Sequence, residues 1–286
     1  MQRSSEIQGL RALAVGLVLL FHAGWLPGGY IGVDVFYVIS GFLITSLIIN
    51  DPKFTFRNFY ARRAKRLLPV AFLVLLVTAT AFWIFAPGGG RAQFSKDLAA
   101  STWYVSNYLY AHWQNDYQNL GATPSPLIHY WSLAVEEQFY LFWPLLLVLT
   151  KNFRKIAVIC VTIGSFLLSL LLVESSPIFA FYSLPTRAFE LGLGALLVLY
   201  PIRAKLIWPG IAAIIVASFI FNSQTPFPAF PALLPIFGAA AVLISLQKNY
   251  ILSNPVALKI GDWSYSIYLW HWPLLTIPPL YLQREL

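Results

Sequence analysis

The stretch LRALAVGLVLLFHAGW, residues 10–25, decides the fold class. Its apolar length is about that of the hydrocarbon core of a membrane, so it predicts a membrane-spanning helix. Two ionisable residues, Arg11 and His22, interrupt it. Their spacing is close to three helical turns, which places both on one helix face and roughly 16 Å apart along the axis. Ionisable groups within a membrane are costly enough to be rare without a function. This pair is therefore the first functional candidate.

The composition is typical of a protein that crosses the bilayer several times. The chain has 286 residues, of which 58% are hydrophobic and 10% are charged, whereas soluble domains carry about a quarter charged residues. The net charge of +8 would suit a nucleic-acid partner, but the basic residues lie in short loops between apolar runs, where cytoplasmic positive charge explains them better. We therefore expect membrane lipids, and no nucleic acid, as partners. The single cysteine, Cys160, excludes an intrachain disulfide and a cysteine metal cage, and we expect no metal.

Nine apolar runs predict an all-α, polytopic transmembrane helical bundle. The first span is interpreted as uncleaved, because no small-residue cleavage pattern follows it. A further segment, residues 97–113, is shorter and more polar, and we expect it to be an interfacial or re-entrant helix. No internal repeat or linker is visible, so residues 1–286 form one predicted domain. The predicted spans cover residues 9–25, 30–49, 68–86, 131–149, 156–173, 183–200, 206–221, 231–247 and 263–282.

The distribution of Lys and Arg predicts the orientation. With a cytoplasmic N-terminus and nine spans, 14 of the 19 Lys and Arg residues fall in inside loops and 3 fall outside, while Arg11 and Arg187 lie within helices. Counting 97–113 as a span would move later basic loops to the outside and remove this bias. The sequence therefore predicts an N-terminus in the cytoplasm and a C-terminus outside.

His22 suits proton transfer, because imidazole gains or loses a proton with little free-energy difference near pH 7. The alternative is a buried histidine that only bonds to a neighbouring helix. The next run, PGGYIGVDVFYVISGFLIT (residues 27–45), brings Asp34 and Ser40 into the second span. Asp34 would enter near the same membrane face as His22 and could pair with it, or it could only cap its own helix. Both interpretations stay open.

The loop FRNFYARRAKRLLP (residues 56–69) carries five basic residues. Arg63 and Arg66 are three positions apart, so they share a face of any short helix there. Paired guanidinium groups suit phosphate. The alternative is a topology signal or contact with anionic lipids, and the run of charge alone favours that alternative.

The run PLIHYWSLAVEEQFYLFWPLLL (residues 126–147) carries two adjacent carboxylates, Glu136 and Glu137, into the fourth span. A carboxylate beside His22 could orient the imidazole and stabilise its cationic form. Adjacent residues on a helix point about 100° apart, so only one of the two can face a given partner.

Two later spans also carry ionisable residues. Arg187 and Glu190 are three residues apart within the sixth predicted span, which predicts a buried ion pair. The last span places His271 among aromatic residues, which is again a titratable group within the membrane.

Together these motifs resemble the acyltransferase-three family of integral membrane O-acyltransferases. The resemblance covers nearly the whole chain and rests on long motifs in the family's order: the Arg–ten residues–His first span, GGYIGVDVFYVISGF, FYARRAKRLLP, HYWSLAVEEQFY, RAFELGLGALL and GDWSYSIYLWHWP. It implies an acyl-CoA donor, usually acetyl-CoA, bound from the cytoplasm, and a carbohydrate hydroxyl as acceptor. The usual acceptors in bacteria are cell-surface polysaccharides, lipopolysaccharide O-antigen and peptidoglycan, which implies a bacterial-type inner membrane.

The resemblance also implies roles for individual residues. His22 would be the catalytic base or a transient acyl carrier. The other expected catalytic residues are Arg11, Asp34 and Glu136, the last favoured over Glu137 by the family's motif. The residues expected to hold the CoA phosphates are Arg62, Arg63 and Arg66. The expected substrate contacts are Ser40, His129, Trp131, Ser132, Tyr140, Tyr265 and His271.

The chain also departs from the family's pattern. Relatives usually continue into a further helix with an acidic-proline motif, and many carry an extracytoplasmic SGNH-type esterase domain, whereas this sequence stops at YLQREL. We therefore expect the family's final helix to be missing, and an inactive or truncated membrane partner is one alternative to an active enzyme. A proton-coupled transporter that uses the same buried His, Arg and Glu is another alternative, which the lack of inverted repeats and the Arg cluster disfavour.

Overall fold

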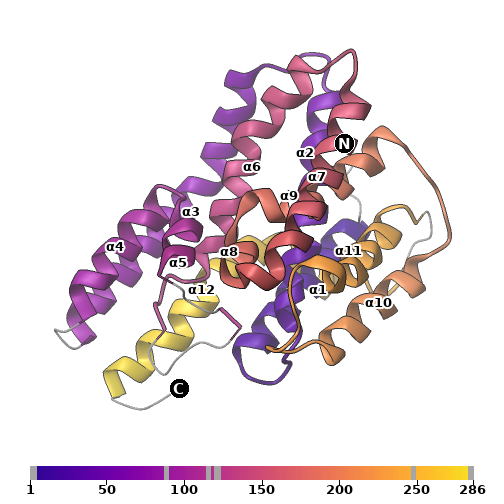
Figure 1. Cartoon of the computed structure of the whole chain (residues 1–286). Helices are drawn as coiled ribbons and strands as arrows, with labels where there is room; N and C mark the ends of the chain where they lie inside the picture. Colours follow the sequence, from indigo (N-terminus) through magenta and orange to yellow (C-terminus); the bar gives the residue numbers. More distant parts are fainter. Residues whose placement is uncertain (1–4, 87–89, 114–116, 119–123, 246–248, 283–286) are drawn as a thin grey trace.

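The computed structural model describes residues 5–86, 90–113, 117–118, 124–245 and 249–282. From the N-terminus the helices are α1 (Ser5–His22), the short 3-10 helix η1 (Gly29–Ile31), α2 (Gly32–Asn50), α3 (Phe56–Phe85), α4 (Arg91–Thr102), α5 (Ser106–His112) and α6 (Tyr130–Leu149). They continue as α7 (Arg154–Ser175), α8 (Pro177–Tyr182), α9 (Leu184–Leu199), α10 (Ile207–Ile220), α11 (Ala229–Leu243) and α12 (Pro255–Leu282) (Figure 1). Within the described residues the extended pairing is limited to an isolated bridge between Ala204 and Ser245.

Among the described residues, five stretches are long and apolar enough to cross a membrane: α1, the continuous run of η1 and α2, α3, α6 and α7. The predicted all-α membrane bundle is therefore confirmed. The count of nine spans stays a prediction, because α10 and α11 are apolar but only 14 and 15 residues long, shorter than the roughly 20 residues that a bilayer core requires. Arg3, Lys248 and Arg284, which enter the charge count, lie outside the described residues.

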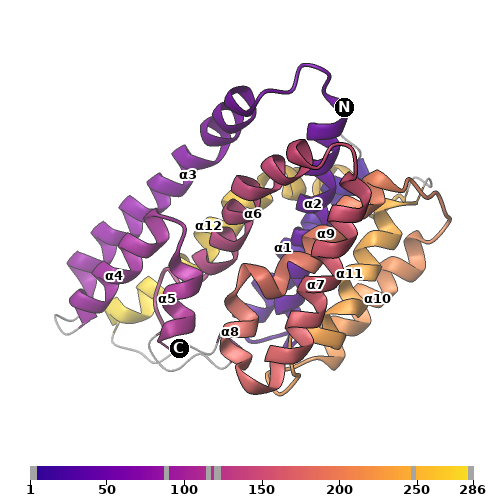
Figure 2. The ribbon, with the colours of Figure 1, turned by 45° about the horizontal axis from the view of Figure 1, so that its top comes forward.

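Residues 97–113 form a helical hairpin in place of one helix. α4 ends at Thr102, α5 begins at Ser106, and Tyr104 between them has a φ of 53°. The carbonyl of Tyr104 accepts a hydrogen bond of 2.9 Å from the side chain of Gln138 on α6, which also donates to Asn107. Backbone groups that leave a helix within a membrane need such partners inside the protein. α4 lies alongside α3, with α5 next to it (Figure 2).

α3 precedes this hairpin in the sequence and α6 follows it, and the two helices run antiparallel. The Tyr130 hydroxyl at the start of α6 donates to the carbonyl of Ala71, and the Tyr60 hydroxyl near the start of α3 donates to the carbonyl of Leu141. α3 therefore ends on the side where α6 begins. A segment that joins two such ends makes no net crossing, which agrees with a re-entrant hairpin and not with a single span.

The centre of the bundle depends on helices that approach at glycine. α2 packs on α9, where Gly41 lies against the carbonyl of Leu191 and Gly194 lies against the carbonyl of Val38. α1 packs on α12 in the same way, with Gly261 against the backbone of Gln8. Small residues allow membrane helices to pack backbone to backbone. These contacts bring α1, α2, α9 and α12 together around the polar residues described below (Figure 1).

We predict that Gly41→Ala destabilises the protein by about 1–3 kcal/mol, because the added methyl group meets the Leu191 backbone and cannot be accommodated by a rotamer change. Gly164→Ala on α7 is the matched control, since nothing lies within 4 Å of the added atom, and alanine is the better helix former by up to about 1 kcal/mol. Thermal unfolding in detergent measures both. Equal stability of the two variants would contradict the proposed packing.

Candidate active site

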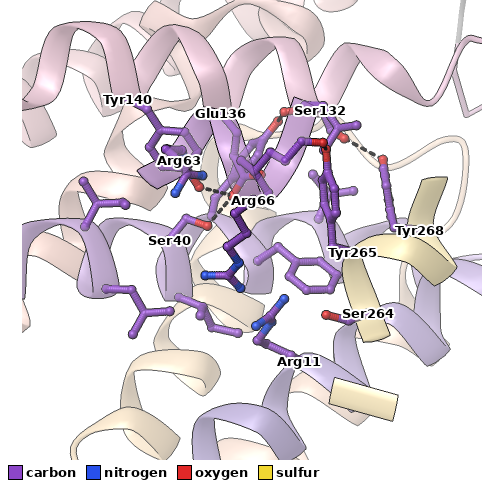
Figure 3. Close-up of a pocket in the computed structure, with 18 of the residues that line it drawn as sticks. Arg11, Ser40, Arg63, Arg66, Ser132, Glu136, Tyr140, Ser264, Tyr265 and Tyr268 are labelled. Carbon is purple, nitrogen blue, oxygen red and sulfur yellow. Dashed lines mark hydrogen bonds between the residues drawn. The ribbon is translucent and has the colours of Figure 1, made fainter. Parts of the chain in front are cut away.

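A cavity of about 240 Å³ lies between α1, α2, α3, α6 and α12. Much of its wall is aliphatic or aromatic, and a set of polar side chains points into it (Figure 3). The polar and charged lining residues are Arg11, Tyr37, Ser40, Arg63, Arg66, Ser132, Glu136, Tyr140, Ser264, Tyr265 and Tyr268. Four of the predicted substrate contacts, Ser40, Ser132, Tyr140 and Tyr265, are thus brought together in one cavity.

Glu136 lies at the centre of the polar wall. Its carboxylate accepts hydrogen bonds from the hydroxyl of Ser40 on α2 and from the hydroxyl of Tyr140, one turn further along α6, at 2.6 Å (Figure 3). Both donors are held by helices, so the carboxylate has a defined position within the cavity.

Three guanidinium groups share the cavity with that one carboxylate. Arg11 comes from α1, and Arg63 and Arg66 come from adjacent turns of α3. The Arg63 guanidinium lies 3.1 Å from the centre of the Tyr140 ring, and its Nε is 3.6 Å from the carboxylate of Glu137. The lining therefore carries more positive than negative charge. Such a cavity attracts an anionic ligand, and the predicted pairing of Arg63 with Arg66 on one helix face is observed.

Arg62 has a different partner. It forms an ion pair of 3.6 Å with Asp51, its side chain is 58% exposed, and it does not line the cavity. The reason is helical geometry, since adjacent residues point about 100° apart. The prediction that Arg62 joins its neighbours in the donor site is therefore corrected by the structure.

His22 ends α1 within a cluster of rings beyond the cavity. Its Nδ1 lies 3.0 Å from the carbonyl of Val18 and 3.1 Å from Nε2 of His271, and its Nε2 lies 2.9 Å from the hydroxyl of Tyr117. The ring of Trp272 packs on the imidazole with 4.6 Å between ring centres. Arg11 and His22 therefore have different surroundings, with Arg11 in the first half of α1 and His22 at its end.

Tyr268 connects this cluster with the cavity. Its hydroxyl lines the cavity and pairs with the hydroxyl of Ser132 at 2.5 Å (Figure 3). Its carbonyl lies 2.5 Å from Nδ1 of His271. His129 is buried on the far side of His271, and its Nε2 donates to the carbonyl of Leu269. Sequence reasoning noted Tyr268 only as a member of the last span and missed Tyr117, because no spacing within one helix connects either residue to His22.

The two carboxylates expected near His22 lie elsewhere. Glu136 faces the arginine-lined cavity, and its hydrogen-bond partners are Ser40 and Tyr140. Asp34 forms an ion pair of 3.2 Å with Arg187 on α9. The expectation that either carboxylate orients His22 is thus corrected, since the ring nitrogens of His22 contact a backbone carbonyl, another imidazole and a phenol.

Arg187 is the centre of a buried charge cluster. The predicted pair with Glu190 is confirmed at 3.0 Å, and Asp34 adds a second carboxylate. All three side chains are at most 1% exposed. The rings of Tyr37, Trp131, Phe181 and Phe227 surround the guanidinium with 5.2–5.8 Å between its carbon and the ring centres. Trp131, a predicted substrate contact, is therefore a fully buried packing residue.

The described residues contain no group of three or more His, Cys, Asp and Glu side chains arranged to hold a metal ion. The chemistry that the site can carry out comes from its arginines, its carboxylate and its imidazoles. The arginines can hold an anion, and an imidazole can take a proton from a hydroxyl group or accept an acyl group.

Comparison with known proteins relates this chain to O-acetyltransferases. The family model described as an acyltransferase domain matches residues 4–277. The chain is 32% identical to the peptidoglycan O-acetyltransferase OatA of Listeria monocytogenes, over 95% of this chain and 49% of that protein. It is also 32% identical to YrhL of Bacillus subtilis, provisionally named a peptidoglycan O-acetyltransferase, over 95% of this chain and 48% of that protein. The chain thus spans about half the length of these relatives. No solved structure is significantly similar to it.

We predict that Arg187→Met destabilises the protein by about 3–5 kcal/mol, because it leaves two buried carboxylates without a countercharge. Arg62→Met is the matched control, since it removes an exposed ion pair that contributes about 0–1 kcal/mol. Unfolding in detergent compares the two.

A combined variant isolates the electrostatic cause. Adding Asp34→Asn and Glu190→Gln to Arg187→Met removes the unpaired charges and should recover much of the lost stability. A combined variant as unstable as Arg187→Met alone would show that packing, and not charge, explains the loss.

Proposed function

Because this chain belongs to the acyltransferase family, we propose that it transfers an acyl group, as acetyl, from coenzyme A to a hydroxyl group of a cell-surface carbohydrate. The observation that carries the proposal is the pairing of an arginine-lined cavity with a partly buried imidazole through one helix, α1. The first would hold the charged part of the donor, and the second would act on the acceptor.

The cavity supports the donor assignment by charge. Coenzyme A carries a diphosphate and a further phosphate, and guanidinium groups bind phosphate oxygens through parallel hydrogen bonds. Arg66 is exposed, whereas Arg63 and Arg11 are partly buried. Phosphates held by these residues would leave the pantetheine arm to extend along the cavity past Ser132 and Tyr268, towards the histidine cluster.

His22 would then act on the acceptor hydroxyl. In direct transfer, the O–H bond breaks, its proton goes to the imidazole, and the hydroxyl oxygen bonds to the thioester carbon. The C–S bond breaks, and the leaving thiolate takes the proton back from the imidazolium. In the covalent alternative, His22 Nε2 bonds to the thioester carbon, the C–S bond breaks, and the thiolate of coenzyme A leaves and takes the hydrogen of the imidazolium. The hydroxyl oxygen then bonds to the acyl carbon, the N–C bond breaks, and the proton of the hydroxyl group returns to the imidazole. Both routes place the same residue at the reacting atoms.

The relatives support the proposed acceptor, and the charge pattern supports the proposed direction of transfer. OatA is named a peptidoglycan O-acetyltransferase, so peptidoglycan is the first candidate acceptor, with O-antigen and exopolysaccharide as further members of the class. The excess of Lys and Arg in the loops that include the start of α3 supports a cytoplasmic donor side. His22, at the other end of α1 from Arg11, would then face the acceptor outside, across a bacterial inner membrane.

We predict that His22→Ala abolishes O-acetylation of envelope glycans, because it removes the group that accepts the proton or the acyl chain. His112→Ala, which truncates an exposed histidine at the end of α5, is the control. Mass spectrometry of glycans from cells that produce each variant at equal membrane levels provides the measurement. Unchanged acetylation with His22→Ala would reject the proposal.

A second prediction concerns the donor. Arg63→Ala and Arg66→Ala should each raise the Kd for acetyl-CoA roughly 10-fold or more, since a hydrogen bond to a charged group contributes about 1.5–3 kcal/mol. Arg62→Ala should leave the Kd unchanged, because that side chain is directed away from the cavity. Titration calorimetry of the purified protein measures all three, and equal effects of Arg62→Ala and Arg63→Ala would overturn the phosphate assignment.

A further inference from the structure

We propose that His271 is the positioning residue for His22, so that a second imidazole performs the task usually given to a carboxylate. The two rings come from opposite ends of the sequence and meet where α1 and α12 pack side by side, with 3.1 Å between His22 Nδ1 and His271 Nε2. This inference rests on the proposed function, because it concerns the base of that reaction.

The backbone partners of the two rings determine where their hydrogens lie. A carbonyl oxygen can only accept a hydrogen bond, so a ring nitrogen that contacts one must carry the hydrogen. His271 Nδ1 contacts the carbonyl of Tyr268, and His22 Nδ1 contacts the carbonyl of Val18. Both neutral rings therefore carry their hydrogen on Nδ1.

This arrangement determines the direction of the hydrogen bond between the two rings. His271 Nε2 is left with a lone pair, and the hydrogen of His22 Nδ1 is shared between this lone pair and the carbonyl of Val18 in a bifurcated hydrogen bond. His22 Nε2 is then left with its own lone pair, and the Tyr117 hydroxyl donates to it at 2.9 Å. The nitrogen that takes a proton or an acyl group is thus Nε2, and it already receives an O–H donor of the kind that a sugar would present.

The surroundings hold this geometry in place. Trp272 follows His271 on α12, packs on the His22 ring, and is anchored by a 2.8 Å hydrogen bond from its Nε1 to the carbonyl of Ser125. The titratable side chains facing His22 are His271 from α12 and Tyr117, with His129 of α6 behind His271. His129 cannot replace His271, because its Nε2 donates to the carbonyl of Leu269 and the ring does not bond to His22. A ring locked by packing and by a bonded partner is preorganised for catalysis.

The kinetic test compares an apolar ring with a neutral acceptor at position 271. His271→Phe removes the acceptor and should lower kcat by about 100-fold or more, with KM for acetyl-CoA within about twofold, because the arginine-lined cavity is untouched. His271→Gln keeps a side-chain carbonyl that can accept from His22 Nδ1, and should retain most of the kcat that His271→Phe loses. Thr276→Val, a buried substitution one turn further along α12, controls for disturbance of that helix.

Wild-type kcat in His271→Phe would overturn the proposal. So would an equal loss of kcat in the Phe and Gln variants, since that result would show that the acceptor atom does not matter. A rise in KM with unchanged kcat would also overturn it, because the residue would then serve donor binding.

A second measurement does not depend on turnover. Nitrogen-15 NMR of the purified protein, labelled at its four histidines and assigned by single variants, distinguishes protonated from unprotonated ring nitrogens. We expect His22 to be protonated on Nδ1 in the wild type, and the shift of this nitrogen to change in His271→Phe, which removes one of its two acceptors and leaves the carbonyl of Val18. Protonation on Nε2 in the wild type would overturn the inference even if His22→Ala is inactive. The expected tautomer together with an active His22→Ala would instead reject the proposed function.

Discussion

Every polar group that these helices carry into the bundle needs a partner inside the protein, and the structure is organised by that requirement. Burial of an unpaired charge or an unsatisfied backbone group in hydrocarbon costs several kcal/mol. Arg187 pairs with two carboxylates from two helices, and Glu136 accepts hydrogen bonds from two hydroxyl groups. The carbonyl of Tyr104, at the break between α4 and α5, accepts a hydrogen bond from the side chain of Gln138. Each of these groups has at least one partner from another element, so the pairing of polar groups and the packing of the helices depend on each other.

The same requirement explains how much could be predicted from the sequence. Apolar length identified the membrane helices, and helical spacing identified Arg187 with Glu190 and Arg63 with Arg66, because both partners lie on one helix. The partners of Asp34 and Glu136 could not be identified in this way. They lie on other helices, or they depend on which neighbouring helix packs against the face that carries the carboxylate. Helical periodicity gives the direction of a side chain but not the helix that it meets. Asp34 therefore pairs with Arg187, and Glu136 faces the cavity.

The histidine cluster could not be predicted for a related reason. Contacts between residue 22 and residue 271 depend on the close packing of α1 and α12, which Gly261 allows against the backbone of Gln8. Both histidines were candidates from the sequence, since a titratable group in an apolar run is costly. Their pairing, and the direction of hydrogen bonding that it determines, needed three-dimensional information.

The hairpin of α4 and α5 does not change whether the chain has crossed the membrane an odd or an even number of times. Because it returns to the side on which it began, it adds two helices between α3 and α6 without changing which face of the membrane any later loop reaches. Its length and composition can therefore diverge among relatives, or accept an insertion, while the sidedness of the downstream helices is preserved. The segment is held to the bundle by its contacts with α3 and α6, and not by a place in the count of crossings.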